Sequence, residues 1–203
     1  MTEHHRRLFP DENPFSTAAI RPGAIAFRFY GDMDAARLLA RLQENHWRGE
    51  IVGPHGSGKS TLLRTLLPLL KAAGRDIRYC AAPPHAKQLP MSAADRATCN
   101  ETTQVVIEGY ELLGRRQQKW VERTCRDQDS GLLITCHQPQ GLQPLLHTAT
   151  TVELAIAIVA QLLPPNCDFI TAADVRERFA RHGQNLRELL FEMYDLYEQR
   201  RPR

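Results

Sequence analysis

The sequence has no apolar segment long enough to cross a membrane. Its longest apolar stretch, residues 152–163, is shorter than the roughly 20 residues that a transmembrane helix needs, and it contains Glu153 and Gln161. Residues 1–10 are polar and lack the apolar centre of a secretory signal peptide. The five cysteines are odd in number and form no C-x-x-C pair, which disfavours a disulfide framework or a zinc site. These absences predict a cytoplasmic protein without membrane contact.

The sequence also carries little net charge. It has 26 Lys and Arg against 23 Asp and Glu, a formal net charge of +3, and part of that charge lies in the two tails. A protein that binds nucleic acid usually concentrates far more positive charge on one face, so a nucleic-acid partner is disfavoured. The 203 residues and the 42% hydrophobic fraction suffice for one sizeable core, or for one core with a small appendage.

A glycine-rich loop is the most specific pattern in the chain. It follows a predicted strand at residues 49–52 and precedes a predicted helix, which is the context that makes G-x-x-x-x-G-K-S a phosphate-binding loop (P-loop, or Walker A motif). Its backbone N–H groups and the helix N-terminus attract the oxygens of a triphosphate. The predicted nucleotide-binding residues are Gly53, Pro54, His55, Gly56, Ser57, Gly58, Lys59, Ser60 and Thr61.

Each polar residue of this loop has a predicted contact. Lys59 reaches the β- and γ-phosphates, the Ser60 hydroxyl ligates Mg²⁺, and Thr61 contacts the α-phosphate. His55 occupies a variable position of the motif and has no specific role in this prediction. The motif therefore predicts that the chain binds a nucleoside triphosphate together with Mg²⁺.

Predicted strands and helices alternate along the first three quarters of the chain. This alternation predicts an α/β fold, a P-loop three-layer sandwich with a mostly parallel five-stranded sheet. A short strand at 24–30 and a helix at 35–45 precede the loop. We expect the helix at 112–126 to turn Trp120 and Val121 inward, and residues 81–100 to be mainly loop. The predicted strands are 49–52, 76–80, 104–107, 131–135 and 150–154, and the helix after the glycine loop is 59–73.

Only helices are predicted after Pro164 and Pro165. A capping box from Thr171 to Asp174 begins one helix, and Asn185 caps the next, whose apolar residues recur at helical spacing. The predicted domains are an irregular N-terminal arm at 1–30, a nucleotide-binding domain at 31–163, and a small C-terminal helical lid at 164–203. The predicted buried face of the last helix comprises Leu186, Leu189, Leu190, Met193, Tyr194 and Tyr197.

Two acids follow the third predicted strand. Glu108 ends that buried strand, where P-loop proteins usually carry an Asp that holds Mg²⁺, so Glu108 and Ser60 are the predicted metal ligands. Glu111 lies three residues further on. It either orients or deprotonates the attacking water, or simply complements the dipole of the following helix.

The fourth predicted strand ends in Thr135, Cys136 and His137. Thr135 and His137 share one face of an extended segment. A polar side chain at this place can bridge the γ-phosphate and the attacking water, so both are candidate catalytic residues, although a Thr or His at a strand end is often structural.

These motifs resemble those of the additional-strand, catalytic-glutamate division of P-loop ATPases, and within it the AAA+ and STAND-like ATPases. V-V-I-E-G-Y-E is similar to their Walker B strand, and L-L-I-T-C-H stands where their sensor 1 belongs. G-Q-N-L-R-E-L-L is similar to the sensor 2 motif. The resemblance implies that Arg187 meets the γ-phosphate from the lid.

The chain departs from that resemblance in two places. Glu108 replaces the expected Asp, and residues 138–150 contain no arginine that could act as a finger in a neighbouring subunit. Arg115 and Arg116 lie on the earlier helix. A ring-forming motor is therefore disfavoured, although an oligomer or an unidentified protein partner stays open, and 81–103 is the only insertion long enough to grip a partner.

The leading hypothesis is an ATPase that hydrolyses ATP slowly with Mg²⁺ and uses it to drive a conformational switch. A small nucleoside or nucleotide kinase is one alternative, and a nucleotide-binding module with little turnover is another. A GTPase is disfavoured because the segment after the fourth strand offers no acid to bind guanine.

Overall fold

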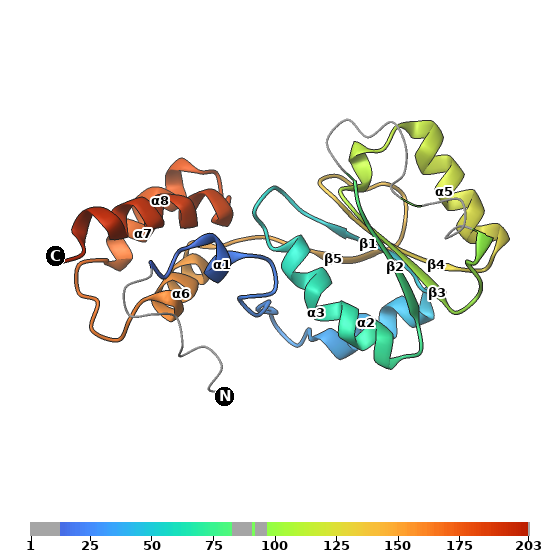
Figure 1. The fold of residues 1–203 in the computed structure, drawn as a ribbon, viewed down its shortest axis with the longest axis horizontal. Coiled ribbons are helices and arrows are strands. Elements are labelled where there is room, and N and C mark those ends of the chain that lie inside the picture. The colour runs from blue at the N-terminus through green and yellow to red at the C-terminus, as the bar shows by residue number, and fades with distance from the viewer. Residues whose placement is uncertain (1–12, 83–90, 92–96, 203) are drawn as a thin grey trace. The chain divides into compact units, whose positions relative to one another are not determined.

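The computed structural model describes residues 13–82, 91 and 97–202 (Figure 1). These residues form two compact units. Among the described residues, unit 1 contains 13–25, 55–58 and 149–202, and unit 2 contains 26–54, 59–82, 91 and 97–148. This division differs from the predicted boundaries at 30/31 and 163/164, because residues 13–25 and the apolar segment after Thr148 pack with the C-terminal helices. The predicted roles of the insertion at 81–103 fall largely outside the described residues.

Unit 2 is built on a five-stranded sheet in which every strand pair is parallel. The strand order is β2-β3-β4-β1-β5, so β4 lies between β1, which leads into the glycine loop, and β3, which ends in Glu108. The predicted α/β fold is confirmed. The strands are β1 (Arg48–Val52), β2 (Asp76–Ala81), β3 (Thr103–Glu108), β4 (Gly131–Cys136) and β5 (Pro144–His147).

The register of the sheet brings the polar strand ends to one edge. Val52 pairs with Cys136, and Ala81 pairs with Glu108. The glycine loop and His137 therefore follow the carboxyl ends of β1 and β4, and Glu108 is the last residue of β3, the strand beside β4. Ligands of open parallel sheets bind at this edge.

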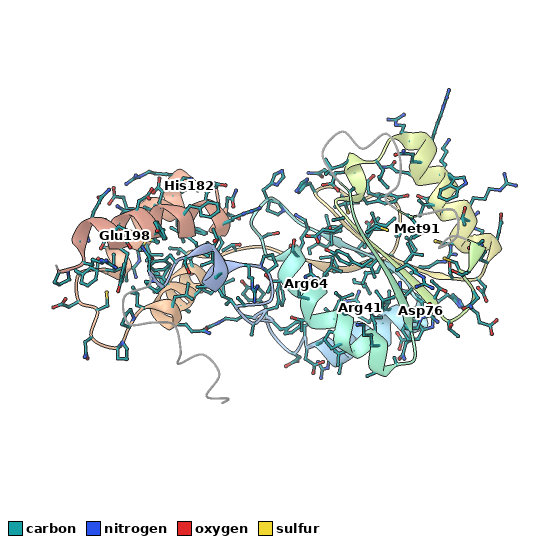
Figure 2. All side chains as sticks on the ribbon, viewed as in Figure 1. Arg41, Arg64, Asp76, Met91, His182 and Glu198 are labelled. Atoms are coloured by element: carbon teal, nitrogen blue, oxygen red, sulfur yellow. The ribbon has the colours of Figure 1, made fainter. Side chains whose placement is uncertain are left out.

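Helices cover both faces of the sheet, since parallel strands bury both of their sides (Figure 1). On one face lie α2 (Ala35–Glu44) and α3 (Lys59–Ala72), whose buried leucines pack on Ile51, Val106 and Leu133. On the other lies α5 (Arg115–Asp127), which contributes Val121 and Cys125 to a second apolar cluster. Arg41 of α2 also donates to the carbonyl oxygens of Leu145 (3.0 Å) and Pro144 (3.2 Å) on β5 (Figure 2).

The fifth strand was predicted at the wrong place. β5 begins at Pro144, and the segment predicted as a strand at 150–154 instead starts the helix α6 (Val152–Leu162). Thr151 caps this helix by accepting a hydrogen bond from the Leu154 N–H (3.2 Å). Ala155, Ile158 and Val159 are its buried residues, and their 3–4-residue spacing is the helical pattern that outweighs the β-propensity of the run.

Two other local predictions were wrong. Residues 26–30 form no strand, although Phe27 and Phe29 pack against the α2–α3 side of the core with their rings 5.0 Å apart. Trp120 does not turn inward with Val121, because 41% of its surface is exposed. Adjacent helical residues point about 100° apart, and on α5 it is Val121, 1% exposed, that faces the sheet.

Unit 1 is helical and has its own apolar core. It comprises α1 (Thr17–Ile20), α6, α7 (Ala172–Arg181) and α8 (Leu186–Arg200). The residues expected to form an irregular arm contribute to it, since Phe15 is 1% exposed and the Asn13 side chain donates to Tyr194 O (2.9 Å). Tyr194, predicted as buried, is 39% exposed, and Leu196 takes its place in the buried face. No described helix combines the length and apolar character that crossing a membrane requires.

The predicted capping box at Thr171 is confirmed. The Thr171 hydroxyl accepts from the Asp174 N–H (3.3 Å), and Asp174 Oδ2 accepts from the Thr171 N–H (2.9 Å). Arg200 of α8 also donates to Asp174 Oδ2 (2.9 Å). Burial alone would raise the pKa of Asp174, but the hydrogen bonds from Arg200 and Thr171 lower that pKa from 3.8 to about 2.

Replacing Asp174 by asparagine tests how much the negative charge contributes to stability. The amide removes the charge but retains an oxygen that can accept the hydrogen bonds of the cap. A folded-state pKa below the unfolded one adds stability above pH 4, and that stability is lost as the pH falls toward 2. We expect Asp174→Asn to lower the free energy of unfolding by about 2 kcal/mol at pH 7. In urea titrations, the difference in unfolding free energy between the wild type and Asp174→Asn should shrink steadily as the pH falls below 4. Asp195→Asn, an exposed acid on α8, is the control, and a difference independent of pH would contradict the assignment.

Candidate functional site

The glycine loop connects β1 directly to α3. The Gly53 N–H, at the end of β1, donates to Cys136 O (3.1 Å) and keeps the loop entrance beside β4. Gly56 and Gly58 have φ angles of 70° and 94°, a backbone region that other residues enter only with strain. Lys59, Ser60 and Thr61 form the first turn of α3. The predicted strand–loop–helix arrangement is therefore present.

Lys59 turns back onto the start of its own loop. Its Nζ atom donates to Gly53 O (2.6 Å) and Pro54 O (2.8 Å). Burial lowers the pKa of Lys59, and the negative charges of Glu111 and Glu108 act against that shift. The ammonium group thus lies close enough to both predicted acids to interact with them electrostatically.

Glu108 joins two hydroxyl groups at the end of β3. The Ser60 hydroxyl donates to Oε1 of Glu108, so the two predicted metal ligands are in direct contact. The hydroxyl of Tyr79, on the neighbouring strand β2, donates to Oε2. Burial and this hydrogen bond raise the pKa of Tyr79 to about 12, and the Arg64 guanidinium lies 5.0 Å from the centre of its ring.

Tyr79 was not among the residues predicted for the site. Its segment was predicted as a strand, but the order of strands in the sheet was not. Only the pairing of β2 with β3, in which Ala81 lies opposite Glu108, places residue 79 next to the acid. The sequence offered one signal for this contact, a tyrosine in a predicted strand that could pair with the strand ending in Glu108.

Glu111 and His137 are brought together from separate elements. Glu111 lies in the 3₁₀ turn η2 (Tyr110–Leu112), and His137 follows the last residue of β4. Nδ1 of His137 is 2.6 Å from Oε1 of Glu111. Within the described residues, the buried Oε2 of Glu111 has no protein hydrogen-bond partner. The pair thus offers one carboxylate oxygen held by a histidine and a second oxygen that can accept a proton.

Thr135 has a structural partner. Its side chain is 1% exposed, and its Oγ1 accepts the Gly109 N–H at 3.0 Å. Gly109 has a φ of 75° and lies between Glu108 and the 3₁₀ turn. The contact fixes the bend that separates the two acids, and the predicted role of Thr135 toward phosphate and water stays a prediction.

The segment after β4 is anchored by a buried acid on β1. Glu50 is fully buried, and its Oε2 accepts the Gln140 N–H at 2.9 Å. This bond holds the chain three residues beyond His137. Burial raises the pKa of the neighbouring Cys136 thiol to about 12, so it stays neutral. Among the residues that the structure describes, no cluster of three His, Cys, Asp or Glu side chains suits a metal ion.

Arg187 lies in the first turn of α8, in unit 1. Asn185 caps that helix through its Oδ1 atom, which accepts from the Arg187 N–H (3.1 Å) and the Glu188 N–H (3.4 Å), as predicted. The Arg187 guanidinium lies 5.8 Å from the centre of the Phe191 ring. The predicted contact of Arg187 with the γ-phosphate stays a prediction.

The all-parallel sheet, the helices on both of its faces and the glycine loop between β1 and α3 define the fold of a P-loop nucleoside triphosphatase. Among solved structures, a Walker-type ATPase of Pyrococcus abyssi superposes with a TM-score of 0.61 at 12% sequence identity, over 92% of this chain and 72% of that one. PCH-2 of C. elegans matches with a TM-score of 0.38 at 14% identity, over 82% of this chain and 67% of that one. No protein-family model and no curated protein sequence matches this chain. At these identities the likeness concerns the fold.

Proposed function

We propose that this protein binds ATP with Mg²⁺ and hydrolyses it slowly, and that hydrolysis drives a conformational switch. The observation that carries the proposal is the contact between Ser60, at the start of the helix after the glycine loop, and Glu108, the last residue of the buried strand β3. The loop supplies backbone amides to a triphosphate, and Lys59 supplies a positive charge.

The oxygens of Ser60 and Glu108 suit a magnesium ion. Mg²⁺ prefers oxygen ligands and is usually bound through one or two protein groups together with substrate phosphates. A hydroxyl and a carboxylate in contact at the helix start offer that donor set, so Ser60 and Glu108 would hold the ion. The bound ion would neutralise charge on the phosphate oxygens.

Tyr79 would orient Glu108 for this role. Tyr79→Phe removes the hydroxyl but keeps the ring beside Arg64. We therefore expect the increase in ATP affinity that Mg²⁺ produces to be about 3- to 10-fold smaller than in the wild type. Calorimetric titration of ATP at several Mg²⁺ concentrations measures this. Affinity for ATP without Mg²⁺ should stay unchanged, and Tyr30→Phe, an exposed tyrosine, is the control. An equal loss with and without Mg²⁺ would assign Tyr79 a general structural role instead.

Glu111 and His137 would act on the attacking water. The Oε2 atom of Glu111 would accept the proton of the water, while His137 holds the other oxygen of the carboxylate. Transfer of the phosphoryl group to that water would give ADP and inorganic phosphate.

The strand order supports the assignment to the additional-strand division, because β4 separates the loop strand from the acidic strand. An AAA+ or STAND-like ATPase is the proposed relationship. Arg187 would sense the γ-phosphate and transmit its loss to the helices of unit 1. A cytoplasmic location is part of the proposal, supported by five cysteines that form no disulfide in the structure.

Calorimetry and product analysis on the wild-type chain test this function. MgATP should bind more tightly than MgGTP, and incubation with ATP should release inorganic phosphate without a nucleoside acceptor. Phosphate transfer that requires a nucleoside would instead identify a kinase. An absence of binding heat for any magnesium triphosphate at millimolar concentration would refute the proposal.

A further inference from the structure

A fully buried carboxylate lies on the strand that leads into the glycine loop. Glu50, three residues before Gly53, is 0% exposed. Its Oε2 atom accepts the Gln140 N–H at 2.9 Å, whereas its Oε1 atom is buried without a hydrogen-bond partner among the residues that the structure describes. None of the ion pairs within those residues involves Glu50. Burial of a carboxylate with so few partners costs free energy that an apolar side chain at this position would not.

The strand β1 holds the segment that carries His137 at both of its ends. At the near end, the Gly53 N–H donates to Cys136 O (3.1 Å), the last residue of β4. At the far end, Glu50 accepts the Gln140 N–H. The backbone on both sides of His137 is therefore fixed to the strand that ends at the glycine loop.

The segment between these two contacts closes on itself. Nε2 of Gln140 donates to Gln138 O (2.8 Å) and to Pro139 O (3.3 Å). The ring of Pro139 fixes its φ angle, which restricts the turn further. A contact made at Gln140 is therefore transmitted along a short, restricted stretch of backbone to His137, whose Nδ1 lies 2.6 Å from Glu111 Oε1.

We propose that Glu50 is a positioning residue for the hydrolysis of ATP. By accepting the Gln140 N–H it fixes the segment 137–140, and with it the contact between His137 and Glu111. Because its side chain is fully buried, Glu50 acts only through this segment and not on the triphosphate or the water. The cost of burying the carboxylate is thus linked to the geometry of the catalytic pair, which such supporting contacts hold in place. This inference rests on the proposed function of Glu111.

Two variants of Glu50 separate its hydrogen bond from its charge. Glu50→Leu removes the acceptor, and Glu50→Gln keeps an acceptor oxygen without the charge. We expect Glu50→Leu to slow single-turnover phosphate release by about 30-fold or more with MgATP affinity within about 3-fold of the wild type, and Glu50→Gln to keep the rate within about 3-fold. Equal slowing in both variants would assign the effect to the negative charge. Equal losses of affinity and rate would give Glu50 a role in the fold alone, and either result would overturn the proposal.

Gln104→Leu is the matched control. Gln104 is also polar and 0% exposed, and its Oε1 atom is likewise buried without a partner among the described atoms. It is the second residue of β3 and pairs with Gly131, the first residue of β4, so it lies at the opposite end of these strands from Glu108 and His137. Gln104→Leu should hydrolyse ATP within about 2-fold of the wild type. Thermal unfolding checks that both leucine variants are folded, and a control as slow as Glu50→Leu would overturn the proposal.

A second test uses the dependence of Glu50 on His137. If Glu50 acts through His137, the double variant Glu50→Leu/His137→Asn should be no more than about 2-fold slower than the slower of the two single variants. Losses that add would show that Glu50 acts on the reaction by another route and would overturn the proposal.

A measurement without nucleotide separates this inference from the proposed function. The NMR signal of the His137 ring nitrogen Nδ1 reports its contact with Glu111. In Glu50→Leu this signal should shift in the same direction as in Glu111→Gln, and in Glu50→Gln and Gln104→Leu it should stay at its wild-type position. An unchanged signal in Glu50→Leu would overturn the positioning role even if the wild type hydrolyses ATP. A shifted signal in a chain that binds no ATP would refute the proposed function and leave the positioning of His137 by Glu50 standing.

Discussion

Replacing Lys59 by alanine will weaken the binding of MgATP by about 100-fold. The ammonium group donates to two backbone carbonyls, Gly53 O and Pro54 O, and burial has already removed part of its hydration. A triphosphate can replace those carbonyls with charged oxygens, and charge-assisted hydrogen bonds contribute about 1.5–3 kcal/mol each. Loss of more than one such bond gives the expected effect in a calorimetric titration.

A matched lysine on the same helix separates this effect from a general loss of positive charge. Lys71 lies in the last turn of α3 and is exposed. Lys71→Ala should therefore bind MgATP within about 2-fold of the wild type. Thermal unfolding of both variants checks the fold, since Lys59→Ala also removes two contacts that hold the loop entrance. If a folded Lys59→Ala bound MgATP as the wild type does, the triphosphate would not lie on this loop.

The parts of the site that the sequence predicted are those with local causes. The glycine spacing, the strand before it and the helix after it are all encoded within about 20 consecutive residues. The caps at Thr171 and Asn185 are equally local, since a side chain within three residues satisfies the free N–H groups. Such features need no knowledge of how distant segments pack.

The parts that sequence reasoning missed depend on contacts between distant segments. Tyr79 reaches Glu108 only because β2 pairs with β3, and the two residues are 29 positions apart. The fifth strand was misplaced because 152–162 is mostly apolar, so its composition suits a buried strand as well as a buried helix. Trp120 was predicted to face inward together with Val121, whereas the side of α5 that faces the sheet is filled by the smaller residues Val121 and Cys125.

Glu111→Gln will reduce ATP hydrolysis by about 100- to 1,000-fold while leaving MgATP affinity within about 2-fold. Glutamine has nearly the same shape but cannot accept a proton from water. The carboxylate is well placed for that step, since His137 holds Oε1 at 2.6 Å and Oε2 is buried without a protein partner among the described atoms. Single-turnover phosphate release measures the chemical step. Glu44→Gln, an exposed acid at the end of α2, is the control and should hydrolyse ATP normally.

Variants of His137 distinguish a catalytic role of Glu111 from a purely structural role at the start of the following helix. If His137 acts by holding Glu111, His137→Asn should slow hydrolysis less than Glu111→Gln does, and the double variant should be no slower than Glu111→Gln alone. Such non-additivity is expected when one side chain works through another. Additive losses would give His137 an independent contact with the phosphate or the water. An unchanged rate in Glu111→Gln would remove the proposed base, and the protein would then be a nucleotide-binding module with little turnover.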